Sequence, residues 1–174
     1  MDYFIMRQDE RLTNVVKMIL PDFLGGGHLT SEQEQELPST MVIFAKENQN
    51  NAYPDYIESP VMLISEKLKR MFSKYQEDII FKTAVLVEKE INRQEVYYLI
   101  SVPKIACVSE TSVFDRQDHV QELVLDTKKV GNARIFCAAD YENKMIVRLD
   151  VAESILRRDS EGIWFEKVNI DRKR

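Results

Sequence analysis

The chain has 174 residues, of which 44% are hydrophobic and 30% are charged, and its 24 Lys and Arg against 29 Asp and Glu give a net charge of −5. This balance excludes a wholly disordered chain, which combines low hydrophobicity with high net charge. It also argues against a nucleic-acid binder, because phosphate neutralisation needs a concentrated Lys and Arg surface. The length favours a single domain over residues 1–174.

The charge is unevenly distributed along the chain. Residues 1–60 hold 4 basic and 10 acidic side chains, a net −6, whereas residues 61–174 hold 20 and 19, a net +1. An acidic region attracts a basic partner over a long range, but solubility alone also explains such a bias. Both explanations stay open, and we expect an acidic, loop-rich part at 1–55 and a nearly neutral body at 56–168.

The ends of the sequence and its two cysteines indicate a compartment. The opening MDYFIMRQDE has no basic region followed by a long apolar stretch, and no run approaches the roughly 18 apolar residues of a membrane span. We therefore expect a cytoplasmic protein that does not enter the membrane. Cys107 and Cys137 should then be reduced and serve as small buried hydrophobes.

The first third predicts few regular elements. In order, we expect a strand at 3–6, a helix at 9–20, a surface loop at 21–40, a strand at 41–45 and a turn-rich segment at 46–56. Apolar residues at helical spacing predict the helix, and Pro21 ends it because proline disfavours helix in the residue before it. The loop contains Gly25, Gly26 and Gly27, which favour positive φ.

Residues 60–75 give the clearest helix signal. Ser65 is a suitable N-cap, since its hydroxyl can accept a bond from a free amide of the first turn. The apolar residues that follow recur at i, i+3, i+4 and i+7, namely Leu68, Met71, Phe72 and Tyr75. This spacing predicts an amphipathic helix packed on a core.

The second half predicts mostly strands. We expect a hairpin at 79–89 and 95–102 with a turn at 91–94, then strands at 120–126, 134–140, 144–150 and 163–168, with a turn at 141–143. Asp150 and Glu153 fit a capping box that starts a last helix, and Gly162 fits its stop. Consecutive strands with short turns favour an α+β fold, with a mostly antiparallel sheet of about five to seven strands and two or three helices packed on it.

The motifs of catalysis and of metal or cofactor binding are weak. The glycine run lacks the Lys–Ser/Thr pair of a phosphate loop, and His28 and His119 are not in a zinc-binding pattern. A small cysteine hydrolase could use Cys107, His119 and Asp126, and no serine lies in a GxSxG turn. We therefore expect no catalytic residue, cofactor or metal, with a small cysteine or serine hydrolase as the least favoured alternative.

Trp164 is the one tryptophan of the sequence, in the predicted last strand. Tryptophan is enriched at binding hot spots, which makes Trp164 a candidate partner contact. Strand alternation puts Trp164 and Glu166 on one face. The alternative is that Trp164 packs beneath the last helix.

Four segments together resemble a family of small bacterial immunity proteins associated with polymorphic toxin systems. They are SPVMLISEKLKRMF at 59–72, YYLISVPKIACVSETSVFD at 97–115, ELVLDTKKVGNARIFCAADYENKMIVRLDVAESILRRDSEG at 122–162 and GIWFEKV at 162–168. The shared features are a helix start at Ser65, Glu66 and Leu68, a strand ending at Leu123–Asp126, a short strand with Ile135 and Phe136, and a final Gly162, Ile163 and Phe165. The resemblance covers about 55–168, and its motifs are structural.

The resemblance implies a non-enzymatic protein that binds a cognate toxin domain and covers its active site. The partner would carry a basic surface, because Glu32, Glu34 and Glu36 lie in the acidic first third. We therefore predict these three residues and Trp164 as partner contacts. The alternative is another non-catalytic binding or regulatory domain, and the oligomeric state stays open.

Overall fold

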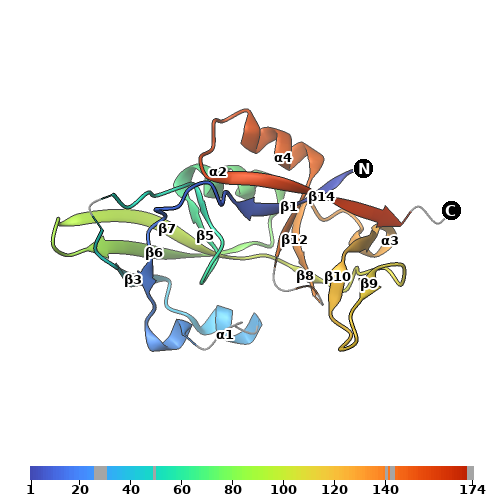
Figure 1. Ribbon diagram of the computed structural model, residues 1–174, viewed down its shortest axis with the longest axis horizontal. Coiled ribbons are helices and arrows are strands. Elements are labelled where there is room, and N and C mark those ends of the chain that lie inside the picture. The colour runs from blue at the N-terminus through green and yellow to red at the C-terminus, as the bar shows by residue number, and fades with distance from the viewer. Residues whose placement is uncertain (26–30, 49, 140, 142–143, 172–174) are drawn as a thin grey trace.

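A computed structural model describes residues 1–25, 31–48, 50–139, 141 and 144–171. In these residues the protein contains two six-stranded sheets, a two-stranded ribbon and four α-helices (Figure 1). This arrangement agrees with the expected α+β class. Most neighbouring strands pair antiparallel, as expected, but they form two six-stranded sheets rather than one, and each sheet includes at least one parallel pair.

The first sheet, here called the terminal sheet, contains strands from both ends of the chain. Its order is β11 (Val124–Asp126), β14 (Ile163–Asp171), β1 (Tyr3–Gln8), β13 (Met145–Arg148), β12 (Ile135–Ala138) and β8 (Lys104–Ile105). The N-terminal strand β1 pairs antiparallel with both β13 and β14, so it lies inside the sheet. The edge strands β11 and β8 pair parallel with their neighbours.

The second sheet, here called the hairpin sheet, is built around the predicted hairpin. Its order is β2 (Met18–Ile19), β3 (Thr40–Ala45), β6 (Ile80–Glu88), β7 (Arg93–Ser101), β5 (Leu63–Ser65) and β4 (Tyr56–Ile57). Strands β6 and β7 pair in register up to Glu88 and Arg93, so the turn occupies 89–92 rather than 91–94. A separate ribbon pairs β9 (Val113–Phe114) with β10 (Val120–Glu122).

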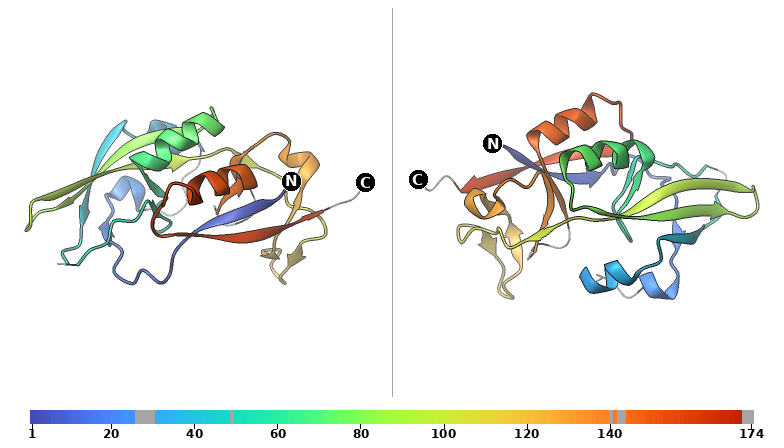
Figure 2. Two further views of the ribbon diagram at one scale, coloured as in Figure 1. Left: turned by 90° about the horizontal axis from the view of Figure 1, so that it is seen from above. Right: turned by 180° about the vertical axis from the view of Figure 1, so that it is seen from behind.

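The two longest helices lie side by side on one side of both sheets. They are α2 (Glu66–Tyr75) and α4 (Leu149–Leu156) (Figures 1 and 2). The predicted N-cap of α2 is confirmed, because the amide of Leu68 donates to the Ser65 hydroxyl. The short helices η1 (Asp22–Leu24) and α1 (Ser31–Glu36) lie across the hairpin sheet from α2, and α3 (Thr127–Val130) follows β11.

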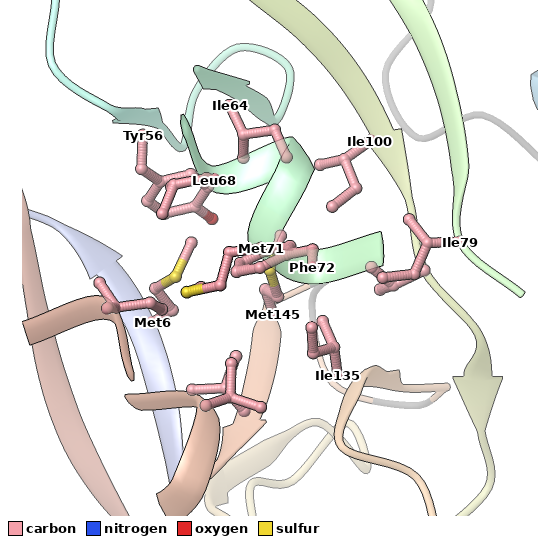
Figure 3. Close-up of a cluster of buried hydrophobic side chains, with 14 of the residues drawn as sticks. Met6, Tyr56, Ile64, Leu68, Met71, Phe72, Ile79, Ile100, Ile135 and Met145 are labelled. Atoms are coloured by element: carbon pink, nitrogen blue, oxygen red, sulfur yellow. The ribbon is translucent and has the colours of Figure 1, made fainter. Parts of the chain in front are cut away.

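The central core joins both sheets to the two long helices. Met6 of β1 and Met145 of β13 pack with Leu68, Met71 and Phe72 of α2 (Figure 3). Each fully buried large apolar side chain contributes roughly 1.5–3 kcal/mol of transfer free energy. Two further clusters cover the other sides: one packs the N-terminal segment on the hairpin sheet, and one packs α3 on the terminal sheet.

The predicted helix at 9–20 is wrong. Val15 forms a β-bridge with Ala52, and Met18 and Ile19 form strand β2 against β3. Val16 and Met18 point into the core of the hairpin sheet, while Ile19 points outward. Tertiary pairing with 44–52 therefore outweighs the local helical spacing, which the β-branched residues support only weakly.

Three further predictions need correction. Segment 21–40 contains η1 and α1, and Gly25 has a negative φ of −82°, while Gly26, Gly27 and His28 lie outside the described residues. The strand at 120–126 divides into β10 and β11, which belong to different sheets, and Leu123 is buried between them.

The predicted capping box at Asp150 is also wrong. Arg148 is the N-cap of α4, and its guanidinium pairs with Asp150 at 2.7 Å, which lowers the pKa of that carboxyl. Gly162 does not stop α4, which ends at Leu156. Gly162 instead has φ +74° at the entry to β14.

Candidate functional site

The structure does not assemble the imagined cysteine hydrolase. The Cys107 side chain is fully buried in the core of the terminal sheet. The Asp126 carboxylate accepts a bond from the Lys128 amide and so caps α3. His119 is exposed, and its Nδ1 lies 3.4 Å from Asp115. Each side chain thus serves a local structural role, and the thiol is closed to a substrate.

Both cysteines are buried, as the sequence predicts. Burial raises the pKa of the Cys137 thiol to about 12, which keeps it protonated at neutral pH. Cys107 and Cys137 lie in different core clusters. Their packing confirms them as small hydrophobes within the fold.

The three predicted acidic contacts divide into two groups. All three lie on α1, where Glu32 and Glu36 are exposed one turn apart. Glu34 points elsewhere: its carboxylate contacts the Ser101 hydroxyl and lies 3.6 Å from the Lys104 ammonium. Glu32 and Glu36 are therefore open to a partner, whereas Glu34 ties α1 to the ends of β7 and β8.

Trp164 lies on the outward face of β14 and is 38% exposed. Its indole Nε1 donates to the backbone oxygen of Gln8 at 3.1 Å. Phe165, the next residue, packs into the central core instead. The alternative in which Trp164 packs beneath the last helix is thus wrong, and the indole is available to a partner.

Sequence reasoning missed an open apolar surface on the hairpin sheet. Strand β3 alternates so that Met41 and Ile43 are buried, while Val42 and Phe44 point outward and are 51% and 39% exposed. The sequence feature that could have pointed to this surface is the unbroken apolar run within both β3 and β6. A strand with such a run normally buries both faces. Here one of the two faces is open over much of the sheet.

Sequence reasoning also missed a polar contact between the sheets. The Arg7 guanidinium of β1 pairs with Glu58 at 3.1 Å, and the Gln8 amide donates to the same carboxylate. The amide of Glu58 in turn donates to the Gln8 side chain. These bonds fix β1 of the terminal sheet beside β4 of the hairpin sheet.

The described residues contain neither a cluster of potential metal ligands nor a membrane-spanning helix. Among them, no group of three or more His, Cys, Asp or Glu side chains is placed to hold a metal ion. No helix in the described part of the chain is long and apolar enough to cross a membrane.

Comparison with known protein families gives a match over most of the chain. The model described as Immunity protein family (Imm11) matches residues 3–169. The match runs from β1 to β14 and therefore includes the acidic first third, which the sequence resemblance placed outside the similar region. It confirms the resemblance to an immunity protein family. A comparison with curated proteins finds no match.

Proposed function

The chain belongs to the immunity protein family Imm11, and from this premise we propose that it binds a cognate bacterial toxin domain and neutralises it. The observation that carries the proposal is the extent of the match, which spans residues 3–169 and so both sheets and both long helices. The proposed mechanism is occlusion: the bound chain covers the active site of the toxin. Occlusion needs a contact surface and no chemistry on this chain.

Two features of the structure support a binding role over a hydrolytic one. The thiols are buried, and Asp126 and His119 contact neighbours of their own. Exposed apolar side chains, in contrast, gather on the outward face of the hairpin sheet. Such patches mark protein-protein contact sites more often than substrate sites. We propose that the protein is not an enzyme and that it acts in the cytoplasm.

The experiment for this function is co-expression with the product of the adjacent gene, which the proposal predicts to contain the toxin domain. We expect growth to be rescued and a stable complex to be recovered by affinity purification. Binding without rescue would favour the alternative, a non-catalytic regulatory or scaffold domain. The absence of both binding and rescue would contradict the proposal.

The contacts predicted from sequence remain a proposal of their own. Glu32 and Glu36 are exposed on α1 and would meet a partner with a basic surface, and Trp164 would add an apolar contact. Replacing both acids with Lys should slow association with the toxin and reverse its salt dependence. An unchanged association rate would contradict the proposal that Glu32 and Glu36 contact the partner, but it would not contradict toxin neutralisation.

A further inference from the structure

Occlusion requires a defined docking surface, and one surface of the hairpin sheet has the chemistry for it. We infer that the toxin domain docks on the open face of this sheet and contacts it with an apolar patch of its own that is flanked by carboxylates. The open face consists of six outward side chains on four adjacent strands: Ile19, Val42, Phe44, Val85, Val87 and Val96. The inference rests on the proposed function and names the site at which it operates.

The strand register makes these side chains one continuous patch. Ile19 is paired with Phe44, and Phe44 with Val87. Two residues away along the strands, Val85 lies between Val42 and Val96. Ile19, Val42 and Val96 are 55%, 51% and 50% exposed. Single exposed apolar residues are ordinary, but a block of six across four strands marks an interaction site.

Nothing else in the described chain covers this patch. Helix α2 packs over the other part of the same face, where Phe81, Tyr98 and Ile100 join the central core. The hairpin of β6 and β7 extends well beyond the end of α2 (Figure 2). The opposite face is sealed by the N-terminal segment on residues such as Ala84 and Leu86. The sheet therefore has one closed face and one half-open face.

Four lysines border the open face. Lys89 holds its ammonium 4.0 Å from the ring centre of Phe44, and Lys69 of α2 lies 3.9 Å from that of Tyr98. Strand alternation also places Lys17 and Lys46 on this side. Among the described residues of β2, β3, β6 and β7, no Asp or Glu takes an outward position.

The nearest carboxylates lie outside the four strands, at the start of α2 and beside the turn of the hairpin. Glu66 pairs with Arg70 at 2.8 Å. Glu47 hydrogen-bonds to Glu90 beside the turn of the hairpin, which raises the pKa of Glu47. Although the whole chain has a net charge of −5, lysines border the four strands of the open face, and the nearest carboxylates lie beyond the strand ends and on α2. A partner with Asp or Glu beside an apolar patch is complementary to it.

The same charges argue against a second copy of this chain as the occupant. A face-to-face pair would bring together the lysines of both copies, with no outward carboxylate from the four strands to neutralise them. Like charges across an interface cost several kcal/mol of binding free energy. Hydrophobic contact with an acidic partner avoids this cost.

The test compares variants of equal exposure inside and outside the open face. Val42→Glu together with Val96→Glu puts two carboxylates in the patch, and both positions are solvent-exposed, so the fold should tolerate them. Val113→Glu on β9 is the matched control, because Val113 is also 50% exposed on a strand and lies outside the face. The dissociation constant is measured for the catalytically inactivated toxin domain, with circular dichroism to confirm folding.

We expect the double variant to bind at least about 10-fold more weakly, as hot-spot loss does, and the Val113 variant to stay within about 2-fold. Equal affinity of the double variant and the wild type would overturn the inference. So would a wild-type dimer that the double variant dissociates without a change in toxin affinity. Failure of the wild type to bind would overturn the proposed function and this inference with it.

Discussion

The carboxylate of Asp55 accepts a hydrogen bond from the backbone amide of Glu161 at 2.8 Å, although 106 positions separate the two residues. The amide of Asp55 returns the contact by donating to the Glu161 oxygen at 3.0 Å. The same carboxylate accepts from the Ser65 hydroxyl at 2.5 Å and from the Lys67 ammonium at 2.9 Å. One side chain therefore ties the start of α2 to the segment between α4 and β14.

Replacing Asp55 with Asn should lower the free energy of unfolding at pH 7 by about 1–3 kcal/mol, the range for bonds to a charged group. Burial raises the pKa of Asp55, but the bonds from Ser65, Glu161 and Lys67 outweigh it and lower the pKa. Its stabilisation is thus present above the unfolded pKa of roughly 3.9 and is lost as pH falls through the folded pKa. Urea unfolding at pH 7 and below pH 3 checks this.

The control for Asp55 is Asp118→Asn at an exposed turn. It should change the unfolding free energy by less than about 0.5 kcal/mol at either pH. The role given to the Asp55 charge would be contradicted if the free energies of unfolding of the wild type and of Asp55→Asn differed by the same amount at both pH values.

Gly162→Ala should destabilise the protein more than Gly131→Ala. Both glycines have positive φ, +74° and +61°, so alanine meets backbone strain of about 1–3 kcal/mol at each. A Cβ on Gly162 would also lie 2.3 Å from the Cβ of Pro54, whereas one on Gly131 meets nothing within 4 Å. This overlap should add about 1–3 kcal/mol. Equal midpoint temperatures of thermal unfolding for the two variants would show that Pro54 moves aside without a loss of stability.

Local signals were sufficient for the elements that depend on their own sequence. The Ser65 cap and the apolar spacing after it fix α2, and β-branched runs around a short turn fix the hairpin of β6 and β7. The signals failed where a contact that the local pattern does not record determines the structure. The segment at 9–20 pairs with 44–52, and Asp150 is held by Arg148, so helix spacing and capping patterns misled.

The candidate site was less predictable than the fold for a related reason. Whether Val42 or Glu34 is open depends on which element packs over it, and no sequence period records that. Glu32, Glu34 and Glu36 look equivalent in the sequence, yet only Glu34 meets Lys104. Outward apolar residues in β3 and β6 look like a second buried face until the end of α2 is known.

Tyr56→Phe should stabilise the protein. The Tyr56 side chain is fully buried in the central core, and its hydroxyl has no hydrogen-bond partner among the described residues. Removing an unsatisfied buried hydroxyl should raise the unfolding free energy by about 1 kcal/mol. Tyr97→Phe is the opposite case, because that hydroxyl donates to the Pro54 oxygen at 2.6 Å, and its loss should cost about 1 kcal/mol. Paired denaturation curves decide both signs.

The two thiols should resist modification in the folded protein. Burial raises the pKa of Cys137 to about 12, so almost no thiolate forms at pH 8, and Cys107 is closed to solvent. With a disulfide reagent we expect no reaction of the native chain over minutes and two equivalents after unfolding in guanidinium. Rapid labelling of one thiol in the native chain would revive a chemical role for that cysteine.

Glu34→Gln and Glu36→Gln should separate a structural acid from a surface acid on the same helix. Glu34 lies between the Ser101 hydroxyl and the Lys104 ammonium, so removing its charge should lower the unfolding free energy by about 1 kcal/mol. Glu36 is exposed, and its variant should stay within about 0.5 kcal/mol of the wild type. Chemical denaturation measures both values. Equal stability of the two variants would mean that the contact with Lys104 is too exposed to matter, and Glu34 would rejoin Glu32 and Glu36 as a possible partner contact.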